Sequence, residues 1–154
     1  MLLGGNIGDV SQIFLEVKKH LQEQGVKILK ESSVYKTQAW GMDLSSPSFL
    51  NQVLKVETYL SPRNLLHTVL KLEEYLGRQR NSELKAYANR LIDIDILIYG
   101  AVILKEEGLI IPHPRIRERR FVLLPLNELA PNWQLPDTKQ HVKQLLLQCT
   151  DTLK

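Results

Sequence analysis

The sequence predicts an α+β fold in which two β-α-β units share one core, followed by a C-terminal hairpin and further helices. The first observation is the order of patterns along the chain, β-α-β-β-α-β, which is the split βαβ or ferredoxin-like arrangement. The second is size and composition, since 154 residues with 44% hydrophobic and 24% charged side chains suit one domain with a hydrophobic core. We therefore expect residues 1–154 to form a single domain with a ferredoxin-like βαββαβ core.

The first β-α-β unit is expected within the first 36 residues. Residues 1–3 read as the end of a strand, and the glycine-containing segment 4–9 makes the turn after it. The glycine spacing of that segment matches neither nucleotide-binding loop pattern, so a tight turn is its expected role. An amphipathic helix is predicted over 11–24, with Gly25 as its C-terminal stop. Residues 26–36 alternate in polarity and predict one long strand.

The second unit begins with another long strand, predicted over 49–59 from its alternating polarity. Ser61-Pro62 is an N-cap followed by proline at the first helical position, and apolar residues continue that helix to Gly77. Residues 78–89 are polar and long for a helix-to-strand connection. Because they carry Arg80 and Lys85 next to the closing strand, we expect them to act as a lid over a bound polyphosphate. An ordinary surface loop is the simpler alternative.

Later segments predict additions to this core. Residues 102–104 and 109–111 suggest a short hairpin, which the prolines of 112–114 end. Residues 121–129 and 141–149 predict two short helices.

The closing strand, 90–99, carries the most informative residues of the chain. Because strand side chains alternate between faces, Asp93 and Asp95 point the same way, with roots roughly 6.6 Å apart. The isoleucines that alternate with them are expected to face the core: Ile92, Ile94, Ile96 and Ile98. Two adjacent carboxylates need a positive partner, and Mg²⁺ prefers such oxygen ligands. An exposed face with two solvated aspartates is the simpler alternative, but the apolar strand and its flanking arginines favour the metal.

Charge and cysteine content narrow the class of protein. The net charge is +3, and seven of the eight arginines lie between residues 78 and 120, on both sides of the aspartate strand. Arginine binds phosphate in a fixed geometry, so this clustering indicates a polyphosphate held between metal and guanidinium groups. The single Cys149 allows no internal disulfide. No apolar run reaches the roughly 20 residues of a membrane span, and no signal peptide is recognised, so we expect a cytoplasmic protein without membrane contact.

Seven motifs occur in order along the chain. They are GNIGD (5–9), SVYKT (33–37), FLN (49–51), LGRQR (76–80), RLIDID (90–95), PHP (112–114) and RRFVLLPL (119–126). This series resembles the 6-hydroxymethyl-7,8-dihydropterin pyrophosphokinase family of the folate pathway, from the first glycine loop to about Pro131. The R-x-x-D-x-D strand followed by P-H-P and R-x-F-x-L-x-P-L is the most specific part.

The resemblance implies a reaction in which the hydroxymethyl oxygen of a reduced pterin attacks the β-phosphorus of ATP. Pyrophosphate is transferred to the pterin and AMP leaves. Such a transfer needs charge neutralisation and positioning more than covalent catalysis. The resemblance also implies two Mg²⁺ ions bound with ATP. We expect a monomer whose partners are ATP and the pterin, and which binds no nucleic acid.

The resemblance further assigns individual residues to these tasks. Catalytic roles fall on Arg80, Arg90 and Asp95, and the metal ligands are Asp93 and Asp95. The ATP-binding positions are Glu73, Arg80, Arg90, Ile96, His113 and Arg119. The pterin-binding positions are Thr37, Trp40, Phe49, Asn51 and Phe121. A flat, polar-edged ring needs aromatic neighbours and an amide, which the two phenylalanines and Asn51 would supply.

Departures from the family pattern gather in 81–89, where the connection is longer than usual and Tyr87 stands in place of a common tryptophan. We expect them to affect closure of the loop and not the type of reaction. The competing function is a ferredoxin-like nucleic-acid-binding module, which would need aromatic side chains on the central strands. A metal-dependent nuclease or nucleotidyltransferase would share the paired aspartates but would not explain Phe49, Asn51 and Phe121.

Overall fold

The computed structural model describes residues 1–38, 47–80 and 92–151, and their side chains except those of 78–80. Its elements follow in the order β1 (Leu2–Gly5), α1 (Val10–Glu23), β2 (Val26–Glu31), β3 (Tyr35–Thr37), β4 (Phe49–Thr58), α2 (Pro62–Arg80), β5 (Asp93–Asp95), β6 (Leu104–Glu106), β7 (Leu109–Ile111), a 3₁₀ turn η1 (Ile116–Glu118), α3 (Arg120–Leu129) and α4 (Val142–Gln148).

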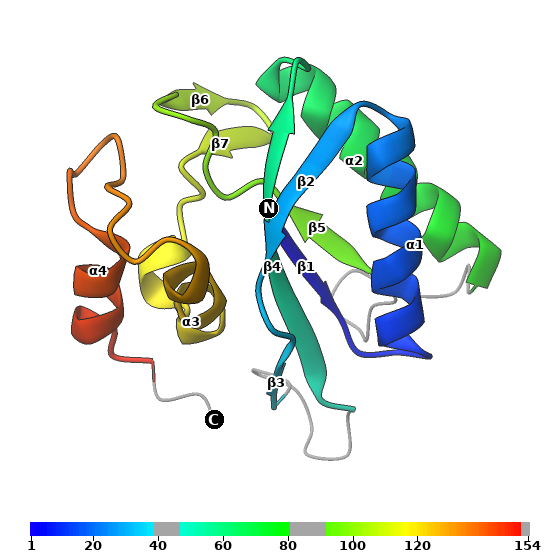
Figure 1. The fold of residues 1–154 in the computed structure, drawn as a ribbon, viewed down its shortest axis with the longest axis horizontal. Coiled ribbons are helices and arrows are strands. Elements are labelled where there is room, and N and C mark those ends of the chain that lie inside the picture. Colours follow the sequence, from blue (N-terminus) through cyan, green and yellow to red (C-terminus); the bar gives the residue numbers. More distant parts are fainter. Residues whose placement is uncertain (39–46, 81–91, 152–154) are drawn as a thin grey trace.

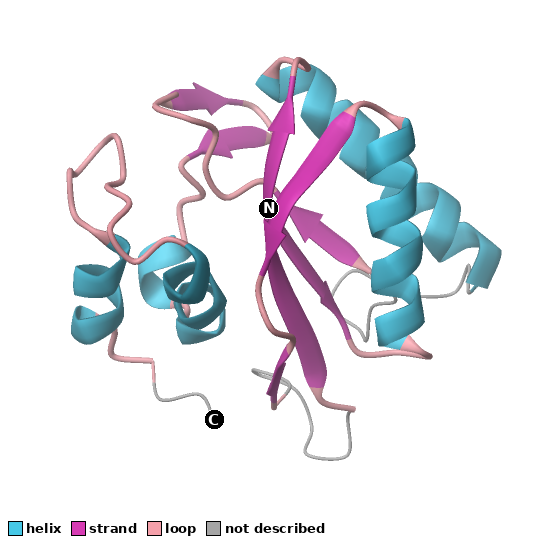
Figure 2. Ribbon diagram, viewed as in Figure 1, coloured by secondary structure: helices cyan, strands magenta, loops and turns pink. Residues whose placement is uncertain are grey.

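The central sheet has the strand order β2-β4-β1-β5, all antiparallel, with the short β3 paired to one end of β4 (Figure 1). β6 and β7 form a separate two-stranded ribbon. Helices α1 and α2 cover one face of the sheet, and α3 and α4 lie on the other side (Figure 2). This mixture of helices with an antiparallel sheet confirms the predicted α+β class.

Each face of the sheet has its own hydrophobic core. Leu3 and Leu54 belong to the first core, with α1 and α2, whereas their neighbours Leu2 and Val53 belong to the second, with α3 and α4. Adjacent residues of β1 and β4 are therefore buried on opposite faces, as expected for the inner strands of a sheet covered on both sides. The ladder between these two strands starts at Met1, whose nitrogen donates to the Leu54 carbonyl at 2.9 Å.

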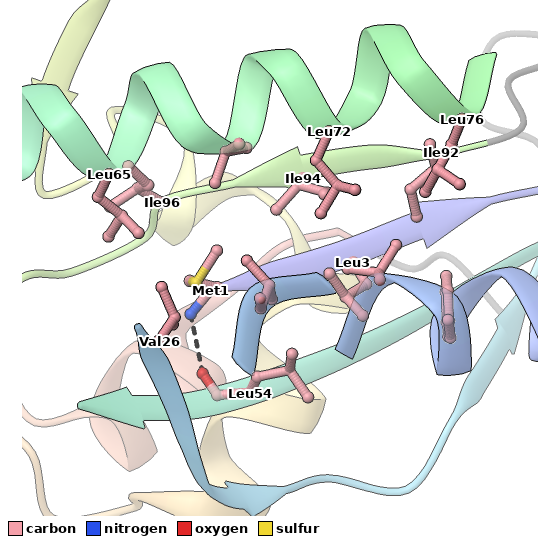
Figure 3. Close-up of a cluster of buried hydrophobic side chains, with 14 of the residues drawn as sticks. Met1, Leu3, Val26, Leu54, Leu65, Leu72, Leu76, Ile92, Ile94 and Ile96 are labelled. Carbon is pink, nitrogen blue, oxygen red and sulfur yellow. Dashed lines mark hydrogen bonds between the residues drawn. The ribbon is translucent and has the colours of Figure 1, made fainter. Parts of the chain in front are cut away.

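The first core joins the aspartate strand to α2. Figure 3 shows the side chains between β5 and α2: Ile92, Ile94, Ile96, Leu65, Leu72 and Leu76. The predicted core face is thus confirmed for three of the four isoleucines. It is wrong for Ile98, which packs against the second core. β5 ends at Asp95. Ile96 and Leu97 still lie in opposite cores, but outside the strand the alternation is not maintained as far as Ile98.

The single strand predicted over 26–36 is wrong, because residues 32–34 separate β2 from β3. The Ser32 N–H donates to the Val53 carbonyl at 2.9 Å, and the Ser32 hydroxyl accepts from the Val53 N–H at 2.9 Å. That hydroxyl also donates to the Ser33 carbonyl at 2.8 Å. A serine that bonds to nearby backbone in this way competes with the strand ladder, and the chain bends before β3 begins.

The ends of the helices agree with the sequence prediction for α1 but not for α2. Asp9 caps α1 by accepting from the Gln12 N–H at 3.1 Å, and Gly25 follows its end with φ +83°. α2 continues past Gly77 to Arg80. Gly77 does not take the left-handed conformation of a stop, so it costs the helix only about 1 kcal/mol, which packing outweighs. None of the described helices is long and apolar enough to cross a membrane.

Candidate active site

The two aspartates of β5 lie half-buried on the sheet face that carries the second core. β5 pairs with β1 so that Asp93 is opposite Gly4 and Asp95 is opposite Leu2. Because paired residues share a face and Leu2 belongs to the second core, both carboxylates lie on the α3 side. Ile94, between them, faces α2. The predicted arrangement of two carboxylates on one face is therefore present.

Glu73 of α2 holds the backbone between the two aspartates. Its Oε1 accepts a hydrogen bond from the Ile94 N–H at 2.7 Å. β5 is the last strand in the sheet order, so a side chain takes the place of a neighbouring strand on this edge. The sequence resemblance placed Glu73 near ATP, and the structure adds a direct link to the strand from which Asp93 and Asp95 project.

A groove of about 240 Å³ lies beside Asp95 and includes Ile96 and His113, two of the predicted ATP-binding residues. It is also lined by residues of α2 and β7, including Leu66 and Leu109. A larger, mostly apolar cavity of about 460 Å³ lies elsewhere and shares only Ile96 with the predicted site residues. The smaller groove differs from the larger cavity in that its lining includes a carboxylate, Asp95, and an imidazole, His113.

His113 is held at the groove by backbone contacts. The backbone N–H of His113 donates to the Leu97 carbonyl at 2.8 Å. Its ring Nδ1 accepts from the backbone N–H of Arg115 at 3.2 Å. An accepting Nδ1 carries no proton, which assigns the neutral ring with its hydrogen on Nε2. Burial lowers the pKa of His113 below its usual 6.5, as do Arg119 and Arg115, while Asp93 opposes the shift. The ring can therefore donate its Nε2–H to a phosphate oxygen while remaining uncharged.

The start of α3 brings a predicted ATP residue next to a predicted pterin residue. The Arg119 guanidinium lies 5.6 Å from the centre of the Phe121 ring, a cation–π contact. Asp151, near the C-terminus, accepts from the Arg120 N–H at 3.0 Å and so satisfies a free donor at the N-terminus of α3. No sequence pattern pointed to Asp151, because its partner is 31 residues away.

The other end of α3 is tied to the segment between β2 and β3. Glu128 accepts from both the Ser33 N–H and the Ser33 hydroxyl, each at 2.7 Å. This carboxylate, also without a signal in the sequence, sets the position of the helix that carries Phe121. The two residues are 95 positions apart, so only the folded chain shows that they meet.

Four of the predicted pterin residues lie on β3, β4 and α3. Thr37 is buried and pairs across the strands with Phe49, which is half-buried. Asn51 is two residues further along β4 and is only 4% exposed. Phe121 is half-buried in the first turn of α3 and packs against the second core.

Asn51 and Asp93 belong to one row of residues across three strands. Asn51 of β4 pairs with Gly4 of β1, and Gly4 pairs on its other side with Asp93 of β5. Paired residues share a face, so the amide predicted for the pterin and a carboxylate predicted for the metal lie on the same side of the sheet, two strands apart.

Other predicted positions lie outside the described residues. These are Trp40, Arg90 and the segment 81–89 of the expected lid. The backbone of α2 includes Arg80, but the side chain of this residue is likewise outside the described part.

Comparison with known proteins decides the family. The sequence model of 7,8-dihydro-6-hydroxymethylpterin-pyrophosphokinase (HPPK) matches residues 1–131. The chain belongs to this family. A 2-amino-4-hydroxy-6-hydroxymethyldihydropteridine pyrophosphokinase of Methylorubrum extorquens is 39% identical over 131 residues, which are 84% of this chain and 80% of that protein. The protein of the same name from Haemophilus influenzae is 36% identical over 150 residues, 97% of this chain and 91% of that one.

A solved structure agrees at the level of the fold. The crystal structure of Plasmodium falciparum HPPK-DHPS with SDX-DHP superimposes with a TM-score of 0.69 at 18% identity. The match covers 96% of this chain and 42% of the Plasmodium chain.

Membership of the HPPK family makes this chain an ATP-dependent pyrophosphokinase, which transfers pyrophosphate to hydroxymethyldihydropterin in folate synthesis. The nucleic-acid-binding alternative is not supported. A sheet that binds RNA presents aromatic side chains on its central strands, whereas β5 presents Asp93 and Asp95 on the α3 side here.

The paired aspartates fit a magnesium site. Among the described residues, no group of three or more His, Cys, Asp or Glu side chains could enclose a metal ion. Asp93 and Asp95 alone would therefore leave most coordination positions open. Mg²⁺ suits such a site, because it keeps several waters and usually takes one or two carboxylates plus substrate phosphates. A closed structural zinc site needs four protein ligands and does not fit.

Proposed function

We propose that the active site is the sheet face formed by β5, β1 and β4, together with the start of α3. There the hydroxymethyl oxygen of the pterin forms a bond to the β-phosphorus of ATP. The bond from that phosphorus to the oxygen shared with the α-phosphate breaks, and AMP leaves. The observation that carries this assignment is the row Asn51, Gly4 and Asp93, which puts an amide suited to a pterin and a carboxylate suited to a metal on one face.

Asp93 and Asp95 would hold Mg²⁺, and we propose two ions when ATP is present. Bound there, the metal supplies charge neutralisation for the phosphates and makes the attacking hydroxyl more acidic. Asp95 would also accept the hydroxyl proton, a role that its place in the lining of the groove beside β5 supports. Glu73 keeps the two carboxylates aligned through its bond to the Ile94 N–H.

The nucleotide would lie along the groove beside Asp95. Ile96 gives this groove an apolar wall, and His113 offers a neutral Nε2–H donor. Arg119 adds a guanidinium next to the start of α3. The proposal also keeps Arg80 and Arg90 as phosphate ligands, on the strength of the sequence resemblance alone.

The pterin would bind between β4 and α3. Phe49 and Phe121 would stack on its rings, and Asn51 would read its donor and acceptor edge. Thr37 lies opposite Phe49 on β3 and closes that side of the subsite. Trp40 completes the set from the sequence resemblance. The contact between Arg119 and Phe121 joins the two substrate subsites at the start of α3.

We also propose a finer architecture and setting. The order β-α-β-β-α-β with sheet order β2-β4-β1-β5 supports a ferredoxin-like core to which the β6–β7 ribbon, α3 and α4 are added. Residues 1–154 would then form one domain. We propose a monomer, which size-exclusion chromatography tests. The lone cysteine, Cys149, suits a reducing compartment such as the cytoplasm.

The test is product analysis with ATP, Mg²⁺ and 6-hydroxymethyl-7,8-dihydropterin. We expect AMP only when the pterin is present, and we expect Asp95→Asn to lower turnover by about 10²-fold or more, the usual contribution of a general base. The variant should still fold, because Asp95 does not belong to the isoleucine core beside α2. Glu57→Gln removes an exposed carboxylate from β4 and serves as the control, with wild-type turnover. Release of ADP, or near wild-type turnover in Asp95→Asn, would contradict the proposal.

A further inference from the structure

Gly4 occupies a position at which any side chain would collide with Asn51. A Cβ built on Gly4 would lie 2.9 Å from the Asn51 Oδ1 and 3.9 Å from the Leu50 carbonyl oxygen. The first distance is shorter than real Cβ contacts, so an alanine at this position requires the Asn51 side chain to move. The Asn51 carboxamide therefore lies directly over the Cα of Gly4.

Asn51 has little freedom to move elsewhere. It is 4% exposed and lies between Gly4 of β1 and Tyr35 of β3, its partners across the two neighbouring strands. Its carboxamide can both donate and accept hydrogen bonds, so it suits a ligand edge that offers both acceptors and donors.

We infer that Gly4 is a positioning residue of the pterin subsite. Because Gly4 has no side chain, the Asn51 carboxamide can extend across β1 in the direction of Asp93. This inference rests on the proposed function, since it requires Asn51 to read the pterin edge. A methyl group on residue 4 would displace the carboxamide from β1. The pterin would then lose its amide contact, and its hydroxymethyl group would be held out of line with the aspartate strand.

Steady-state kinetics on a double-mutant cycle tests this. Gly4→Ala should raise the KM for the pterin about tenfold, the factor that corresponds to losing one hydrogen bond, and lower kcat, with the KM for ATP almost unchanged. Asn51→Ala should raise the pterin KM at least as much. The double variant Gly4→Ala/Asn51→Ala should match Asn51→Ala alone, because the group that Gly4 accommodates is gone.

Gly77→Ala is the matched control. A Cβ on Gly77 would meet no atom within 4 Å, and Gly77 itself is assigned to neither substrate subsite, so all kinetic constants should stay at wild-type values.

Different results would overturn the positioning role of Gly4 and the pterin subsite. If Gly4→Ala raises the pterin KM equally with and without Asn51, the positioning role of Gly4 is overturned while the pterin subsite stands. If Asn51→Ala leaves the pterin KM unchanged, the subsite itself is wrong and the inference falls with it. If Gly4→Ala does not fold, the double variant decides. Recovery of folding supports the collision, and failure to recover overturns it.

Discussion

Replacing Glu73 with alanine removes the acceptor of the Ile94 N–H, a bond of 2.7 Å between α2 and the edge strand β5. A hydrogen bond to a charged group contributes about 1.5–3 kcal/mol, and an N–H left without an acceptor costs about 1–3 kcal/mol. Glu73 is half-buried, so water can replace part of the lost bond. We therefore expect Glu73→Ala to lower the free energy of unfolding by about 1.5 kcal/mol. For a protein of this size that corresponds to a decrease in Tm of about 3–6 °C.

Turnover should fall together with stability in Glu73→Ala, because Asp93 and Asp95 project from the backbone that this bond holds. Glu73→Gln keeps an acceptor oxygen and should recover most of both quantities. Urea unfolding followed by circular dichroism measures the stability, and AMP release at saturating ATP and Mg²⁺ measures the turnover.

Lys71 gives a control on the same helix, since its side chain is exposed. Lys71→Ala should change the free energy of unfolding by less than about 0.5 kcal/mol. The proposed role of Glu73 is refuted if Glu73→Ala unfolds at the wild-type urea midpoint. It is also refuted if Glu73→Gln loses as much stability as Glu73→Ala.

Two further predictions follow from contacts near the site. Because the pKa of His113 is lowered, the folded protein binds a proton on this ring less tightly than the unfolded chain does. The neutral ring therefore contributes to stability above pH 6.5, and this contribution is lost as the pH falls below 6.5. NMR titration of the metal-free protein should give a pKa of His113 below 6.5, and Arg119→Leu should raise this pKa. A pKa at or above 6.5 in the wild type would contradict the prediction. Glu128→Ala removes both bonds to Ser33 and should cost about 1 kcal/mol, because the pair is exposed. Thermal unfolding measures this loss, with Glu118→Ala as the control, because Glu118 is an exposed glutamate of η1. Equal melting temperatures for the two variants would show that Glu128 does not anchor α3.

Local patterns in the sequence were sufficient for several features of the site. Strand periodicity placed Asp93 and Asp95 on one face and three isoleucines on the other, because alternation is a property of the extended backbone. Gly25 marked the end of α1, because its positive φ suits glycine. The ordered motifs were sufficient to identify the family. The same local reasoning failed for the strand over 26–36, where hydrogen bonds of Ser32 override the alternation.

Tertiary structure alone decided how these features are held together. Glu73 bonds to Ile94 over 21 residues, and Glu128 bonds to Ser33 over 95 residues. Such partners are selected by the path of the chain, and no local preference of either residue encodes them. Gly4 is a further residue whose role only the tertiary structure shows. In the sequence it reads as part of a turn, but in the sheet it lies between Asn51 and Asp93, and only that pairing makes its missing side chain matter.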